Sequence, residues 1–212
     1  MMFSRLLVIL SLFVLTACGA AEPRWASEAE VSRARYVSNE PTSLTLFTVV
    51  GKRNGSGAHS GLLVNAPSQR AMFDPAGTFK HPHLPERNDV IFGMSDAAVA
   101  FYVDYHARET FNVIEQTIEV SPQVAEFALA RIQSYGAVPK AQCARSISSI
   151  LASIPGFQDA PSTMFPNKLT RYFEAKGATS RVHMDDSPDD NSGLIQAPDL
   201  RLGRDLTVAL AE

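Results

Sequence analysis

The sequence predicts an α+β domain in which strands come first along the chain and helices follow. Two observations carry this prediction. Segments rich in Val, Ile, Phe and Tyr recur between residues 43 and 120, as is typical of strands. After Ser121-Pro122, apolar residues recur instead at helical spacing, and glycines or a Pro-Gly pair mark the ends of the predicted helices. A run of strands followed by a run of helices is the pattern of the α+β class.

The N-terminus resembles the export signal of a bacterial lipoprotein. Arg5 supplies a positive charge, and Leu6–Leu15 is an apolar run too short for a membrane span, which needs roughly 20 residues. The run ends in Leu15-Thr16-Ala17-Cys18, which matches the lipobox, in which the cysteine is acylated and becomes the mature N-terminus. Gly19, rather than Asp, implies the outer membrane, with the protein facing the periplasm. The alternative is an ordinary signal peptide cut after Ala17.

The remaining chain predicts one domain held at a membrane by its lipid. About 195 residues follow the signal, enough for a single core. We expect a signal at 1–17, a lipidated N-terminus and tether at 18–40, a catalytic domain at 41–180, and an acidic, largely irregular tail at 181–212. The formal net charge of −3 offers no basic surplus, so nucleic acid is not an expected partner.

Six strands are expected in order along the first half of the domain. The Gly-rich segment 51–58 connects the first two, and the short segment 65–68, with Pro67, predicts a hairpin between the second and third. Asp74-Pro75-Ala76-Gly77 ends the third strand, and residues 78–88 read as a loop. The expected strands are 43–50, 59–66, 69–73, 89–94, 99–106 and 110–120.

Three helices are expected after the strands, near 121–135, 140–154 and 166–176. Ser121 is a good N-cap, with proline at the first helical position. In the second helix Ile147, Ile150, Leu151 and Ile154 share one face, and Cys143 lies on that face one turn earlier.

Cys143 is a candidate nucleophile. The chain has two cysteines, and lipidation of Cys18 would leave Cys143 without a partner in an oxidising compartment. A helix start favours the thiolate, and Lys140 and Arg145 lie nearby in sequence. The alternative is that Cys143 is a small apolar residue filling the buried face of its helix.

A cysteine nucleophile needs a base, ordinarily a histidine. Position alone favours His59 only slightly, because it opens a strand directly after the Gly-rich connection. The other four histidines are two in the 78–88 loop, one at a predicted strand end and one beside the acidic tail: His81, His83, His106 and His183.

The segment Gly57-Ala58-His59-Ser60-Gly61-Leu62-Leu63-Val64 resembles the histidine strand of circularly permuted papain-like hydrolases, relatives of the NlpC-type cell-wall peptidases and of lecithin retinol acyltransferase. In this group the histidine strand precedes the cysteine helix, as His59 precedes Cys143 here by 84 residues. The resemblance covers roughly residues 44–173. It implies an antiparallel sheet packed against helices, with Cys143 as nucleophile and His59 as base.

The same resemblance implies a third polar residue on the strand after the histidine strand, and Asp74 is the nearest match. A carboxylate there would accept the Nδ1–H of His59 and fix the reactive tautomer. The alternative is that Asp74 only begins a turn, in which case His81 or His83 would substitute. Gln142, or the backbone N–H of Cys143, is a candidate oxyanion donor.

No metal or cofactor is expected. His81-x-His83 has no further ligand at a recognisable spacing, and the aspartates at 185, 186, 189 and 190 lack the glycine and glutamate of a calcium loop. The sequence therefore predicts a periplasmic thiol hydrolase acting on an amide or ester, with a peptidoglycan peptide as a candidate substrate. The alternatives are a non-catalytic peptide- or lipid-binding lipoprotein on the same fold, and a lipid-directed acyltransferase with an apolar cleft.

Overall fold

The computed structural model describes residues 20–189, which form seven strands and five helices. The strands are β1 (Ser43–Gly51), β2 (Gly57–Asn65), β3 (Arg70–Phe73), β4 (Glu86–Arg87), β5 (Val90–Phe92), β6 (Phe111–Glu119) and β7 (Thr179–His183). The helices are α2 (Glu28–Ala34), α3 (Asp96–His106), α4 (Pro122–Tyr135), α5 (Cys143–Ser153) and α6 (Pro166–Ala175). None of these helices has the length and apolar character needed to cross a bilayer.

The strands form one antiparallel sheet in the order β4-β5-β3-β2-β1-β6-β7. The predicted hairpin of β2 and β3 is confirmed, with Leu62 opposite Phe73. β1 is central and pairs along its length with both β2 and β6. β3 is short, so the first half of β2, which carries His59, extends past it.

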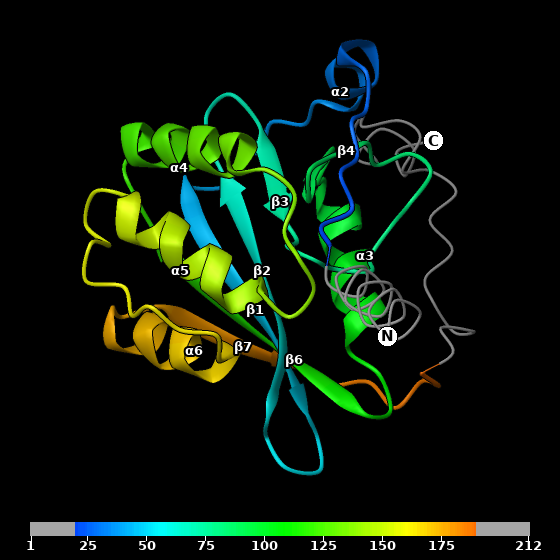
Figure 1. The fold of residues 1–212 in the computed structure, drawn as a ribbon, viewed down its shortest axis with the longest axis vertical. Coiled ribbons are helices and arrows are strands. Elements are labelled where there is room, and N and C mark those ends of the chain that lie inside the picture. The colour runs from blue at the N-terminus through cyan, green and yellow to red at the C-terminus, as the bar shows by residue number, and fades with distance from the viewer. Residues whose placement is uncertain (1–19, 190–212) are drawn as a thin grey trace, which may run out of the picture.

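Helices cover both faces of the sheet, which confirms the α+β class and the packing of an antiparallel sheet against helices. Figure 1 shows α4, α5 and α6 on one side and α3 on the other. Alternation along β1 divides the two cores, because successive side chains point to opposite faces. Leu44 and Leu46 pack in the core with α4, α5 and α6, whereas Phe47 and Val49 pack in the core with α3.

The three helices predicted after the strands are confirmed. Ser121 caps α4 by accepting a hydrogen bond from the backbone N–H of Val124, and Pro122 is the first helical residue. The apolar face of α5 is buried as expected, with Ile147, Ile150 and Leu151 fully inside the core.

The prediction of a strand at 99–106 is wrong, because these residues belong to α3. Ser95 caps this helix by accepting from the backbone N–H of Ala98. The buried residues Ala98, Phe101 and Tyr102 follow helical spacing. The content of valine and aromatic residues suggested a strand, but the cap and the packing against the sheet decide for a helix. The expected strand 89–94 is also shorter, since β5 spans only Val90–Phe92.

The segment expected as a tether, 18–40, is folded onto the domain from residue 20 onward. The backbone N–H of Asn88 donates to the carbonyl of Arg24 at 3.1 Å, and that of Ala26 donates to Glu86 at 3.0 Å. α2 follows, and its Val31 is part of the hydrophobic core. The signal at 1–17 and Cys18 lie outside the described residues.

The start of the expected irregular tail, 181–212, also differs from the prediction. Residues 181–183 complete β7, which pairs with β6 at the edge of the sheet. Beyond it, Lys52 Nζ contacts the Asp185 carbonyl and the Asp186 carboxylate, each at 2.7 Å. No apolar alternation marks this strand in the sequence, because β7 is mostly exposed and polar. Asp190 and the residues after it lie outside the described range.

Candidate active site

Cys143 is the first residue of α5, which begins three residues later than the expected helix near 140–154 and keeps Cys143 in its first turn. The turn before it brings the backbone N–H of Gln142 to the carbonyl of Pro139 at 3.3 Å, and Ala141 adopts a positive φ of 62°. Non-glycine residues rarely adopt this conformation, so the turn that presents the thiol is held against its local preference. Cys143 is buried, with 7% of the residue exposed.

The sulfur of Cys143 lies where the edge of β2 is left open by the short β3. Pairing between β2 and β3 reaches only Leu62 on β2, so the backbone of Ser60 is free of that ladder. Burial raises the pKa of the Cys143 thiol, while hydrogen bonds from the backbone N–H groups of Ser60 and Ala144 lower it. The strand that carries the histidine therefore also supplies a hydrogen-bond donor to the thiol.

His59 lies on β2 opposite Val49, next to Ala58, the extra residue of a β-bulge in β2, and its side chain is 16% exposed. Asp74 follows β3 and is buried, with its Oδ1 2.7 Å from Nε2 of His59. We expected the carboxylate to hold Nδ1, and this detail is wrong: the carboxylate holds Nε2, which leaves Nδ1 as the ring nitrogen available to Cys143. The ring of His59 interacts with the thiol on one side and with the carboxylate on the other.

Two residues of α3 complete the site, and the sequence analysis missed the role of both. The Tyr102 hydroxyl donates to Oδ1 of Asp74 at 2.8 Å, so that oxygen is held by two groups. His106, one turn later, stacks its ring on His59, with ring centroids 5.7 Å apart and planes within 10° of parallel. Its Nδ1 lies 2.8 Å from the carbonyl of Tyr102. In the expected strand 99–106, Tyr102 and His106 would lie far apart along the extended chain. In a helix, residues four apart are neighbours on one face.

Two glycines are required by this packing. A methyl group added at Gly61 would overlap the Tyr102 hydroxyl, and one added at Gly77 would overlap the Asp74 carboxylate. Gly61 is the glycine of the His-Ser-Gly sequence, and Gly77 ends the Asp-Pro-Ala-Gly turn. Both glycines therefore give the carboxylate network its space, in addition to any role in backbone conformation.

The electrostatics of the site favour separated charges on His59 and Cys143. Burial disfavours the imidazolium, but the Asp74 carboxylate outweighs it and raises the pKa of His59 well above its usual range. Burial likewise opposes ionisation of Asp74, but His59 lowers the pKa of that carboxyl overall. Burial would raise the pKa of Cys143, yet the hydrogen bond and charge of His59 lower it. The arrangement supports a thiolate–imidazolium pair.

His106 behaves differently from its stacking partner. Burial lowers the pKa of His106 to about 4, although the Asp74 carboxylate acts in the opposite direction. At neutral pH this ring is therefore uncharged, and it lies against a charged ring. Two stacked histidines with opposite pKa shifts have distinct environments and are suited to distinct roles.

The remaining residues predicted at the site have different places. Gln142 directly precedes Cys143 and is partly buried, but its side chain does not cap α5. His81 and His83 lie in the 78–88 loop, where His81 packs against Phe101. The residue that contacts His59 is Asp74, so neither of these histidines takes its place. His183 lies in β7, 2.6 Å from a carboxylate oxygen of Glu115.

A metal is not needed to explain the arrangement. Within residues 20–189, one trio of ligand-type side chains lies close enough to be considered, with donor atoms of His59, Asp74 and His106 within 4.8 Å of one another. Two ligands of one tetrahedral zinc stand about 3.3 Å apart, from bond lengths of about 2.0–2.1 Å. His59 and Asp74 are closer, at 2.7 Å, and contact each other directly. His106 stacks on His59, and its Nδ1 contacts the Tyr102 carbonyl.

A cavity of about 360 Å³ opens beside the imidazole rings. Its walls include His59, His106, Tyr105 and Phe111, together with the 76–78 segment. The cavity gives a small molecule or one end of a chain access to His59.

Comparison with models of known protein families, with curated proteins and with solved structures finds no significant match.

Proposed function

We propose that this protein is a thiol hydrolase or acyltransferase that uses Cys143 as nucleophile, His59 as base and Asp74 as the residue that orients the base. The contact of His59 with both Cys143 and Asp74 is the observation that carries the proposal. A buried thiol that only filled the face of α5 would not need a histidine held by a carboxylate at its sulfur.

The reaction follows from these contacts. The Cys143 thiolate attacks the acyl carbon of an amide or ester, and the carbonyl electrons move to its oxygen. Candidate donors to that oxyanion are the backbone N–H of Cys143 and the side chain of Gln142. When the oxyanion collapses, the bond to the leaving group breaks and His59 gives its proton to that group. The acyl group remains on Cys143 as a thioester.

The second half-reaction regenerates the enzyme. A water molecule or a hydroxyl acceptor gives its proton to His59 and attacks the thioester carbon. The carbon–sulfur bond then breaks, and the thiolate is restored beside the imidazolium. Asp74 stays ionised throughout and stabilises the charge on His59, with Tyr102 holding the carboxylate in place. The identity of the acceptor distinguishes a hydrolase from an acyltransferase.

The order of elements favours a permuted papain-like architecture. The histidine strand precedes the cysteine helix, the sheet is antiparallel, and the helix lies against the histidine strand. Together with the lipobox at Cys18, this supports a lipoprotein of the outer membrane that faces the periplasm, where cell-wall peptides are candidate substrates. The architecture derives from the resemblance of the histidine strand, and the location derives from the resemblance of the N-terminus to a lipoprotein signal.

Trapping the thioester tests the proposed function directly. The purified protein is mixed with a nitrophenyl acyl ester, quenched in acid and examined by intact-mass spectrometry. We expect a mass increase of one acyl group, mapped by peptide analysis to Cys143, and no increase in the Cys143→Ala variant. A protein that binds peptides or lipids without catalysis would show no acylation of wild type and no release of nitrophenol above the variant.

A further inference from the structure

We propose that the surface formed by residues 20–24, 76–80 and 138–140, called here the anchor face, rests against the bilayer, so that the candidate active site opens at the membrane surface. The docking partner is the headgroup layer of the membrane that holds the Cys18 lipid. The inference rests on lipidation of Cys18, and its consequence for substrates rests on the proposed function.

The first step is the loss of the expected tether. A flexible segment of 20 residues would let the domain reach far from its lipid, with an r.m.s. span of about 25 Å. In the structure this segment is instead fixed to the domain by the hydrogen bonds of Arg24 and Ala26 to the 86–88 segment and by the burial of Val31. Ser27 and Glu30 form a capping box that fixes the start of α2.

The second step is chain length. Only Gly19 stands between Cys18 and Ala20, the first described residue. Two residues of extended chain span at most about 7 Å. An acyl chain on Cys18 therefore holds Ala20, and the surface around it, within about that distance of the lipid headgroups.

The third step places the candidate active site beside Ala20. A cavity of about 120 Å³ is lined by Ala20 together with Gly77, Asp89, Val138 and others. The same 76–78 segment also lines the cavity that contains His59 and His106. The two cavities thus share one wall. Lys140, three residues before Cys143, lies 3.9 Å from Glu22 of the N-terminal segment.

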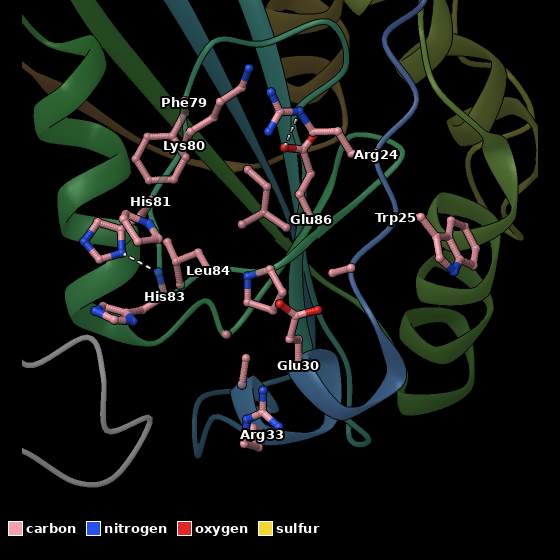
Figure 2. Close-up of a pocket in the computed structure, with 16 residues that line it drawn as sticks. Arg24, Trp25, Glu30, Arg33, Phe79, Lys80, His81, His83, Leu84 and Glu86 are labelled. Carbon is pink, nitrogen blue, oxygen red and sulfur yellow. Dashed lines mark hydrogen bonds and ion pairs between the residues drawn. The ribbon is translucent and has the colours of Figure 1, made fainter.

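The fourth step concerns the depth of docking. Beyond the small cavity lies a larger one of about 610 Å³, and both are lined by Arg24, Lys80 and Glu86. Figure 2 shows these charged side chains with Arg33 and Glu30 around the larger cavity, and the contact between Arg24 and Glu86. Charged side chains are costly in hydrocarbon and suited to the headgroup layer. The anchor face therefore rests on the headgroups without inserting.

The consequence concerns substrates. A site held at the headgroup layer meets acyl groups that are displayed at that layer, and meets acyl groups far from the membrane rarely. The docking geometry thus selects substrates by their position, in addition to any selection by the cavity.

The experiment measures the distance of two labels from the membrane. The lipidated Cys143→Ala protein carries no other thiol, because the chain has two cysteines and Cys18 is acylated. One fluorophore is placed at Lys140→Cys on the anchor face and, in a second protein, at Ser180→Cys on β7. Both positions are exposed. Residues 76–80 of the anchor face follow β3, and β7 lies four strands from β3 in the sheet, about 19 Å away. The proteins are reconstituted in vesicles containing lipids with a nitroxide on the headgroup.

We expect severalfold stronger quenching at position 140 than at position 180. Inserting 20 Gly/Ser residues between Gly19 and Ala20 should lower the quenching at 140 and remove the difference. Equal quenching at the two positions without the linker would overturn the proposal. Failure of the protein to stay on vesicles would overturn it as well, by excluding the lipid. Neither outcome depends on catalysis, because the nucleophile is absent from every protein used.

Discussion

The two faces of the sheet differ in chemistry, and the candidate site takes one part from each. On the α5 face, apolar side chains such as Ile147 and Ile150 pack the helix that presents Cys143. On the α3 face, Tyr102 and His106 contact the Asp74–His59 pair. Apolar packing thus places Cys143, the candidate nucleophile, and a polar network sets the charge of His59, the candidate base. The stability of the fold and the reactivity of Cys143 are therefore controlled from opposite sides of the sheet. Variants on the two faces should separate these two properties.

The largest effect is expected from loss of the nucleophile or the base. Cys143→Ala and His59→Ala should lower kcat/KM by at least about 10³-fold, because each removes a group without which no thioester forms. Cys143→Ala should keep a thermal midpoint near that of wild type, since it leaves no large cavity. His59→Ala leaves the buried Asp74 carboxylate without its cationic partner and should lower the midpoint, so its turnover is measured well below that midpoint. Turnover of an activated ester and thermal unfolding measure the two quantities.

The control for this pair is His183→Ala. His183 is also held by a carboxylate, Glu115, at 2.6 Å, but it lies in β7 away from the thiol. It should leave turnover unchanged. A comparable loss of activity in His183→Ala would show that the first result reflects general damage to the sheet.

A smaller effect is expected from the orienting carboxylate. Asp74→Asn keeps the shape of the side chain but removes the charge that stabilises the His59 imidazolium, and kcat/KM should fall by about 10²-fold. The pKa of His59 should fall, so the imidazolium should be lost at lower pH than in wild type. The pH dependence of kcat/KM measures both changes. An unchanged pH dependence of kcat/KM would mean that Asp74 only stabilises the turn it begins and does not act on His59.

A smaller effect again is expected from Tyr102→Phe. The variant removes one hydrogen bond to a buried carboxylate, a contribution of about 1.5 kcal/mol, and should lower kcat/KM by roughly tenfold. Tyr172→Phe is a matched control on the other face, since Tyr172 donates to Asp159 at 2.7 Å. The control should leave the pH profile of turnover unchanged. Equal shifts of that profile in the two variants would contradict the division between the faces.

The smallest effect on reactivity is expected from the apolar face. Ile150 is fully buried, and Ile150→Ala should lower the free energy of unfolding by about 2–5 kcal/mol. Turnover well below the unfolding midpoint should stay close to wild type, because the helix start and the polar network are untouched. Denaturant unfolding and kcat/KM test this together. A large loss of turnover in a folded variant would mean that the core also tunes the thiol.

The same division explains what the sequence could and could not predict. Local spacing and turn residues, which act over a few positions, predict the apolar face of α5, the place of Cys143 in the first turn of that helix and the pairing of β2 with β3. The resemblance predicts roles for His59 and Asp74, and in the structure His59 interacts with the thiol while Asp74 contacts His59.

The α3 face was not predictable in the same way. The aromatic and valine content of 99–106 suits a strand, and only Ser95 before it signalled a helix. Tyr102 and His106 reach Asp74 and His59 through contacts between elements that are distant in sequence. The fold of residues 20–40 was missed for a related reason, since its hydrogen bonds go to the 86–88 segment. Neither contact leaves a local pattern, although the capping box Ser27-x-x-Glu30 is a local signal for the start of α2.

The central claim is that His59 makes Cys143 a thiolate, and the rate of Cys143 alkylation against pH tests it most directly. Wild type should show a midpoint below the ordinary thiol pKa of about 8.5. In His59→Ala, burial acts on the thiol without the opposing hydrogen bond and charge, so the midpoint should move above 8.5. Reactivity near pH 6 should then be lost. Coincident midpoints in the two proteins would contradict the account.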